Sequence, residues 1–180
     1  MVVDELHPIA RDSISAFTEH GYFRSIRLCH VVASVSPAEC VAWATRLIEP
    51  AVSESNQHPI VVETLTLVKS LTATPTADAL LGLDALAWQC WTAGRFDDSK
   101  PYLQRAVARL AWATIGLVCL TDRCAFASER VAITADPDDN SAIKTLVYQS
   151  ASAIDMTHTR SDNGRLMVAL DFSHLMERLT

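Results

Sequence analysis

Residues 88–120, WQCWTAGRFDDSKPYLQRAVARLAWATIGLVCL, decide the fold of this chain. The second half of the stretch, from Ala106 to Leu120, is apolar on nearly every side and carries a single charge, Arg109. A helix of that kind lies among other helices in a protein core. It is only about fifteen residues long, whereas a membrane span needs roughly twenty. The stretch therefore predicts a buried central helix and no membrane span.

The first half of the same stretch has the sequence pattern of a helical hairpin, in which a turn separates two helices. Gly94 ends one apolar-periodic segment, Phe96 follows two residues later, and a second apolar segment then begins. The same order occurs earlier in the chain around Gly21 and Phe23. Antiparallel helix pairs of this kind usually act as surfaces for other proteins.

The second hairpin places a tryptophan, a glycine, an aromatic residue and two small residues in order: Trp88, Gly94, Phe96, Ser99 and Ala106. With this order the hairpins resemble tetratricopeptide repeats, although the two copies are far apart in the chain instead of in tandem. The resemblance implies stacked helical hairpins without a regular superhelical groove. Residues 21–50, with the helix near Trp88, are also similar to a bacterial family of small all-helical proteins that accompany type VI secretion genes. That similarity implies a secretion setting.

Start and stop signals predict helices elsewhere in the chain. Pro8 suits the first turn of a helix. Ser36 can cap a helix that has Pro37 in its first turn, and Glu39 completes a capping box. Pro50 is predicted to end that helix.

Segment 59–72 is ambiguous, because it is rich in β-branched residues that suit a strand. Ile60, Thr64 and Val68 also fall at helical spacing, and no second strand candidate is available for pairing, so a helix is predicted. The whole chain, residues 1–180, is predicted to be one all-α domain of seven to nine helices in irregularly stacked antiparallel hairpins. It comprises N-terminal hairpins in residues 1–53, central hairpins in 54–135 and C-terminal helices in 136–180.

The charge balance narrows the class of partner. The net charge is −6, and the fifteen basic residues are scattered. A nucleic-acid binder normally has a clustered basic footprint, so nucleic acid is not expected as a partner. Another protein is expected instead, and an acidic chain would suit a basic protein through electrostatic steering. The oligomeric state is left open.

The five cysteines lack the two-residue spacing of zinc sites and are interpreted as buried free thiols in a reducing compartment. No metal or other cofactor is expected. The acidic residues Asp4 and Glu5 do not suit a secretory signal. The prediction is a cytoplasmic protein, and export without a cleavable signal stays open.

No catalytic residue is assigned, because the chain has no nucleophile elbow and no glycine-rich phosphate loop. Residues 155–165 are interpreted as a flexible polar loop whose arginines could bind an anion and whose histidine could do acid–base work. Trp88 and Trp91 share a helix face and could anchor either a core or an interface. The candidate binding residues are His158, Arg160, Asp162, Arg165, Trp88 and Trp91.

The predicted function is a non-enzymatic protein-binding protein. It would serve as an adaptor, chaperone or immunity protein in a bacterial secretion or toxin system. Two alternatives remain open: a secreted effector that acts in a target cell, and an enzyme that uses the loop around His158.

Overall fold

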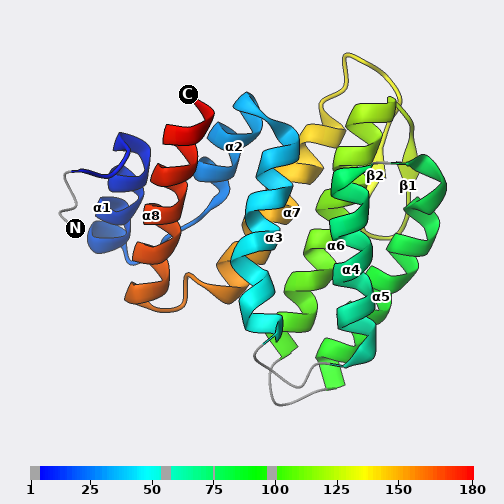
Figure 1. The fold of residues 1–180 in the computed structure, drawn as a ribbon, viewed down its shortest axis with the longest axis horizontal. Helices are drawn as coiled ribbons and strands as arrows, with labels where there is room; N and C mark the ends of the chain where they lie inside the picture. Colours follow the sequence, from blue (N-terminus) through cyan, green and yellow to red (C-terminus); the bar gives the residue numbers. More distant parts are fainter. Residues whose placement is uncertain (1–4, 54–57, 75, 97–100) are drawn as a thin grey trace.

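Helix α6, Pro101–Asp122, lies at the centre of the fold. The computed structural model describes residues 5–53, 58–74, 76–96 and 101–180. Helices α3, α4, α5 and α7 pack around α6 (Figure 1), and its apolar side chains from Leu103 to Cys119 are buried. In the described part of the chain, α6 alone is long and apolar enough to cross a membrane, but 83% of its apolar window is buried inside the protein. The predicted central core helix is confirmed.

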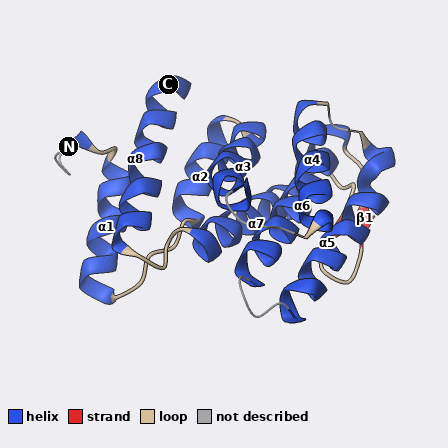
Figure 2. Cartoon of the chain, turned by 60° about the horizontal axis from the view of Figure 1, so that its bottom comes forward, coloured by secondary structure: helices blue, strands red, loops and turns tan. Residues whose placement is uncertain are grey.

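The all-α class is also confirmed, because the described residues form eight α-helices (Figure 2). The sequence predicted no sheet, whereas the structure has one small hairpin in which Phe126 pairs with Ile133 and Ala127 with Ala132. Strands of two residues are too short to show an alternating pattern. The elements are α1 (Pro8–His20), α2 (Ile26–Val35), α3 (Pro37–Ser53), α4 (Pro59–Ala73), the 3-10 helix η2 (Ala77–Ala79), α5 (Leu80–Phe96), α6, β1 (Phe126–Ala127), β2 (Ala132–Ile133), α7 (Ser141–Thr157) and α8 (Asp162–Leu179).

Helices α5 and α6 form the predicted hairpin, since they run in opposite directions and pack closely together (Figure 1). Gly94 was expected to end α5, but the helix continues to Phe96. The predicted position Ser99 lies outside the described residues. On its other side α6 packs most extensively on α7. A Cβ at Gly116 would lie 2.9 Å from the backbone nitrogen of Leu146, so only glycine lets these helices approach so closely.

The N-terminal hairpin differs from the prediction. Gly21 ends α1 in a left-handed conformation with φ of 71°, as expected. Helix α2 begins at Ile26, not at Tyr22, and α1 packs chiefly on α8, which lies between α1 and α2 (Figures 1 and 2). The backbone N–H of His7 donates to Ser173 Oγ at 2.8 Å and ties the start of α1 to α8.

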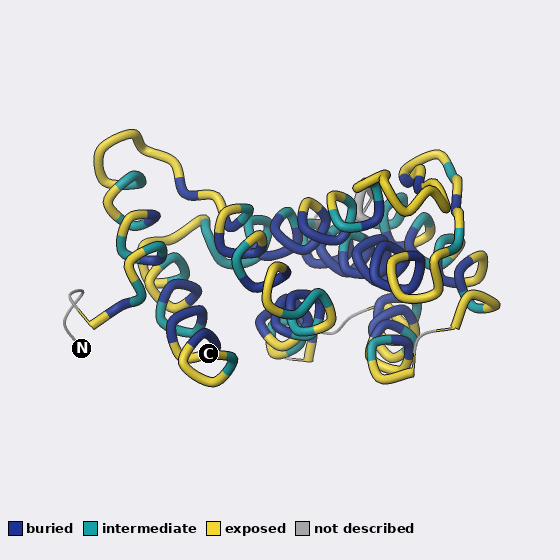
Figure 3. Tube along the Cα trace, turned by 90° about the horizontal axis from the view of Figure 1, so that it is seen from above, coloured by how far each residue is buried: buried dark blue, intermediate teal, exposed yellow. Residues whose placement is uncertain are grey.

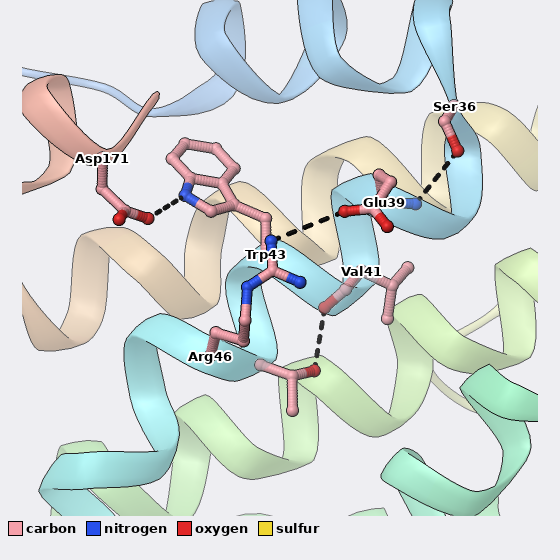
Figure 4. Close-up of polar contacts among 7 residues, drawn as sticks. Ser36, Glu39, Val41, Trp43, Arg46 and Asp171 are labelled. Carbon is pink, nitrogen blue, oxygen red and sulfur yellow. Dashed lines mark hydrogen bonds and ion pairs between the residues drawn. The ribbon is translucent and has the colours of Figure 1, made fainter. Parts of the chain in front are cut away.

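Helix α3 begins as predicted, because Ser36 Oγ accepts a hydrogen bond from the backbone N–H of Glu39 at 3.3 Å (Figure 4). It does not end at Pro50 but continues to Ser53. Proline lacks an N–H and leaves the carbonyl of Arg46 without its helical donor. Arg46 is exposed, so this carbonyl lies at the edge of the core, and only the last turn of the helix follows.

Helix α4 shows how a β-branched segment becomes helical. Val61, Leu65 and Val68 face the core at helical spacing. The threonine hydroxyls are satisfied within the helix: Thr64 donates to the carbonyl of Ile60 at 2.6 Å, as other threonines do to theirs. Burial of one face therefore outweighs the strand preference of these side chains, and the helix prediction is confirmed.

Seen from above, the buried trace is concentrated in the middle of the molecule and the exposed trace in the outer turns (Figure 3). A buried tryptophan links the central helices to α8, because Trp43 Nε1 on α3 donates to Asp171 Oδ2 at 2.7 Å (Figure 4). The Phe172 ring packs beside the same indole, with 6.0 Å between ring centres. The α1–α8 pair is thus attached to the core through α3.

Candidate functional site

Three arginines surround one tryptophan between α5, α6, α7 and the β1–β2 hairpin. The guanidinium carbons of Arg105, Arg109 and Arg130 lie 5.4, 4.9 and 4.8 Å from the centre of the Trp91 ring. We call this group and its two neighbouring rings the arginine–tryptophan cluster. Its residues are Trp88, Trp91, Arg105, Arg109, Arg130 and Tyr148.

Two helices and one turn bring most of the cluster together. Trp88 and Trp91 are three residues apart on α5, and Arg105 and Arg109 are four apart on α6, so each pair shares a helix face. Arg130 comes from the turn between the two short strands. In that turn Ser128 Oγ accepts hydrogen bonds from the backbone N–H groups of residues 130 and 131, both at 3.3 Å, and this fixes the direction of the chain.

A partly buried carboxylate attaches the hairpin to the helices. Asp84 Oδ1 on α5 accepts hydrogen bonds from Trp112 Nε1 at 2.9 Å and from Ser128 Oγ at 3.1 Å. Trp112 is buried and packs on Trp91, with 5.7 Å between ring centres. Asp84 therefore positions both the tryptophan below the cluster and the turn that carries Arg130.

Arg109 is the most enclosed charge of the cluster. Its guanidinium group lies near both the Trp91 ring and the Tyr148 ring, 5.7 Å from the centre of the latter. Its Nη1 donates to Gln149 Oε1 at 2.9 Å. Burial lowers the pKa of Arg109, and the neighbouring charge of Arg130 lowers it too, while Tyr148 raises it. The protonated guanidinium is thus held at a cost in free energy in the protein alone.

The positive charges of the cluster form no ion pair with any carboxylate of the described residues. Within the described part of the chain, none of Arg105, Arg109 and Arg130 forms an ion pair. The Nε atoms of Arg105 and Arg109 are buried and make no hydrogen bond, and the same is true of Trp91 Nε1. Other arginines of the chain form ion pairs with carboxylates, as Arg46 does with Glu39 at 3.5 Å. The cluster therefore combines cation–π contacts with unused hydrogen-bonding capacity.

The outer side of the cluster is open. Arg130 is exposed, Tyr148 is 52% exposed, and Trp88 is partly exposed. A cavity of about 220 Å³ lies beside Trp88 and Arg130, between α5 and the hairpin, and Asp84 and Glu129 also line it. An incoming group can reach Trp88 and Arg130 from this side.

The polar segment 155–165 is not the flexible loop that was predicted. Residues up to Thr157 belong to α7, and α8 begins at Asp162, so only a short turn separates them. Gly164 makes the turn tight, because a Cβ there would lie 1.8 Å from the carbonyl oxygen of His158. Asp155 is partly buried beside the start of α2, where its Oδ1 accepts a hydrogen bond from the backbone N–H of Ser25 at 2.9 Å.

The four candidate residues of this segment do not form one group in the structure. His158 Nε2 lies 2.5 Å from the carbonyl oxygen of Leu47, so this nitrogen carries the proton and donates. Arg160 lies over the Tyr102 ring at 5.1 Å. Arg165 pairs with Asp162 at 2.6 Å and rests on a phenylalanine of α1, beside a cavity of about 550 Å³ between α1 and α8.

The structure therefore brings together Asp162 with Arg165, and Trp88 with Trp91, but it does not gather the six candidates in one place. Sequence reasoning missed the three arginines and Tyr148 that complete the cluster. One signal was present, since Arg109 interrupts an otherwise apolar helix and Arg105 lies one turn before it. No sequence pattern indicated that Arg130 would join them.

Comparison with known proteins gives no match: no family model, no curated protein and no solved structure resembles the chain significantly. The similarity to tetratricopeptide repeats and to a secretion-associated family stays a prediction. Among the described residues, no three His, Cys, Asp or Glu side chains come together as a metal ion would require.

Proposed function

We propose that this chain is a protein-binding protein that holds its partner at the arginine–tryptophan cluster. The observation that carries the proposal is the gathering around Trp91, beside an open surface, of three arginines that form no ion pair with a described residue. Tryptophan, tyrosine and arginine are the residues in which interface hot spots are enriched, and the cluster consists of these three types.

The contacts that hold the cluster in place support the same proposal. Trp91 rests on the buried Trp112, which is held by Asp84, so the central ring is fixed before a partner arrives. A rigid aromatic anchor loses little conformational entropy when it binds. The stacked arginine side chains are likewise partly ordered in advance. An adaptor, chaperone or immunity role in a bacterial secretion system is the part of the proposal that rests on the resemblance alone.

The test is a tagged pull-down from the native host, read by mass spectrometry, with matched variants. We expect the wild-type chain to retain one partner in a stoichiometric amount, and Trp88→Ala with Arg130→Gln to lose it. The control is Tyr22→Ala with Arg178→Gln, because both residues are exposed and neither belongs to the cluster or lines its cavity. A partner retained equally by both double variants would refute the assignment to the cluster. No captured partner at all would refute the function.

A further inference from the structure

The arginine–tryptophan cluster carries positive charge on a protein whose net charge is −6. We propose that it binds a short acidic segment of the partner protein, with carboxylates of that segment pairing with Arg105, Arg109 and Arg130. This inference rests on the proposed function and specifies its partner. It departs from the expectation of a basic partner, which used only the overall charge of the chain.

The stacking of the arginines favours a carboxylate ligand. A guanidinium group that lies over an aromatic ring still has its N–H edge available, and that edge matches the two oxygens of a carboxylate. Arg109 uses one Nη in its bond to Gln149. Arg130 is exposed, and its side chain makes no hydrogen bond or ion pair with the described residues, so its edge is open to a ligand.

An arriving carboxylate would also relieve an existing cost. Arg105 and Arg109 flank the same ring as Arg130, so three like charges share one small region. Like charges that are partly removed from water repel one another, and an anion between them changes that repulsion into attraction. A partly buried arginine without a carboxylate gains more from such a ligand than an exposed, already paired one.

The acidic neighbours decide where the carboxylates lie. Asp84 and Glu129 line the cavity beside Trp88 and Arg130, so an anion is repelled from the cavity itself. A carboxylate therefore meets Arg130 on the side that faces Trp91, beside Arg105 and Arg109, and the cavity at Trp88 receives a neutral or basic side chain of the same segment. A segment that mixes acidic and apolar residues fits this arrangement.

A protein segment fits better than a nucleic acid. Nucleic acids carry a long row of charges, which the net charge of −6 repels beyond the few ångströms that the cluster covers. Three arginines can neutralise only a short anionic stretch. An acidic peptide matches that length.

The experiment measures fluorescence anisotropy of a fluorescein-labelled oligoglutamate peptide at about 0.15 M ionic strength. We expect the full chain to bind it saturably, and Arg105→Gln with Arg130→Gln to weaken binding at least about tenfold. This pair leaves the more enclosed Arg109 in place, and circular dichroism confirms that the variant is folded. The matched control is Arg46→Gln with Arg178→Gln, which removes the same charge from exposed positions on α3 and α8 and should bind like the wild type.

Several outcomes would overturn the inference. Equal weakening by both double variants would mean general attraction to the protein's charge. Tighter binding of oligolysine, or of oligothymidylate of the same length, would assign the cluster to a different class of partner. Full competition by inorganic phosphate at concentrations similar to those of the peptide would mean a small-anion site.

The two proposals fail separately. A native partner that is lost with Trp88→Ala and Arg130→Gln, together with no oligoglutamate binding, would keep the proposed function and remove the acidic segment. Specific oligoglutamate binding by a chain that captures no native partner would keep the anion-binding role of the cluster and remove the proposed function.

Discussion

The indole nitrogen of Trp43 lies 2.7 Å from Oδ2 of Asp171, and this hydrogen bond joins α3 to α8. Trp43 has no exposed surface, and Asp171 is partly buried. Helix α8 also packs on α2, and this bond adds a polar link from α8 to α3.

Replacing Asp171 tests that link. Asp171→Ala leaves the buried N–H of Trp43 unpaired, and an unpaired buried donor costs about 1–3 kcal/mol. We expect the free energy of unfolding to fall by that amount in urea denaturation. Asp171→Asn keeps an oxygen acceptor and should lose much less. Equal losses in the two variants would contradict a role for the hydrogen bond itself.

Two glycines give a matched pair for helix packing. Gly116→Ala would push a Cβ into the backbone of α7, 2.9 Å from the nitrogen of Leu146. We expect it to destabilise the protein by more than about 1 kcal/mol, because backbone atoms cannot rotate away. Gly82 is exposed on α5 and has nothing within 4 Å of its ideal Cβ. Gly82→Ala should stabilise by up to about 1 kcal/mol through helix propensity. Thermal unfolding of both variants checks the opposite signs.

The stability of the fold should depend on pH through Asp155. Burial raises the pKa of Asp155 above its ordinary 3.8, although hydrogen bonds from Ser25 oppose the shift. The folded state thus binds the proton more tightly than the unfolded state. The resulting stabilisation is complete below pH 3.8 and is lost as the pH rises through the raised pKa.

Asp155→Asn isolates this effect, because the amide is neutral at every pH and still accepts from Ser25. We expect the variant to melt at a higher temperature than the wild type at pH 7. The difference should shrink as the pH falls, and vanish below the ordinary pKa. The assigned sign of the pKa shift would be wrong if the stability of Asp155→Asn, relative to that of the wild type, were lower at pH 7 than at pH 3.

The thiols should differ sharply in reactivity. All five cysteines are free, and only Cys124 is partly exposed. Burial raises the pKa of Cys90 to about 11 and that of Cys119 to about 12. Since the thiolate is the reactive form, iodoacetamide at pH 8 should modify Cys124 first in the native protein. Mass spectrometry should find one adduct, and none in Cys124→Ser. Several adducts formed at the same rate would contradict the buried positions.

Local patterns predicted the parts of the fold that depend on local physics. The apolar run around Ile115, the glycine stop at Gly21 and the cap at Ser36 act through neighbours in sequence, and each lies where it was expected. The packing of α1 on α8 depends on contacts between distant segments, which no local periodicity encodes. The loop prediction for residues 155–165 was wrong because a polar sequence can be ordered by buried partners, as Asp155 is by Ser25.

The candidate site was predicted in part for the same reason. Trp88 and Trp91 were visible as a pair on one helix face. The arginines that surround Trp91 come from α6 and from the β1–β2 turn, and only the fold brings them to the same ring. The charge that matters for a partner is thus local, while the net charge of the sequence has the opposite sign.

The packing of α1 against α8 sets an order of events on the ribosome. His7 and its partner Ser173 are 166 residues apart, so α1 is synthesised long before the helix that covers it. Until α8 emerges, Ile9, Ile14 and Phe17 lack the main packing partner of α1. A nascent chain in this state presents a hydrophobic helix, which is the kind of segment that chaperones recognise. Helix α1 is therefore made well before it is fully covered.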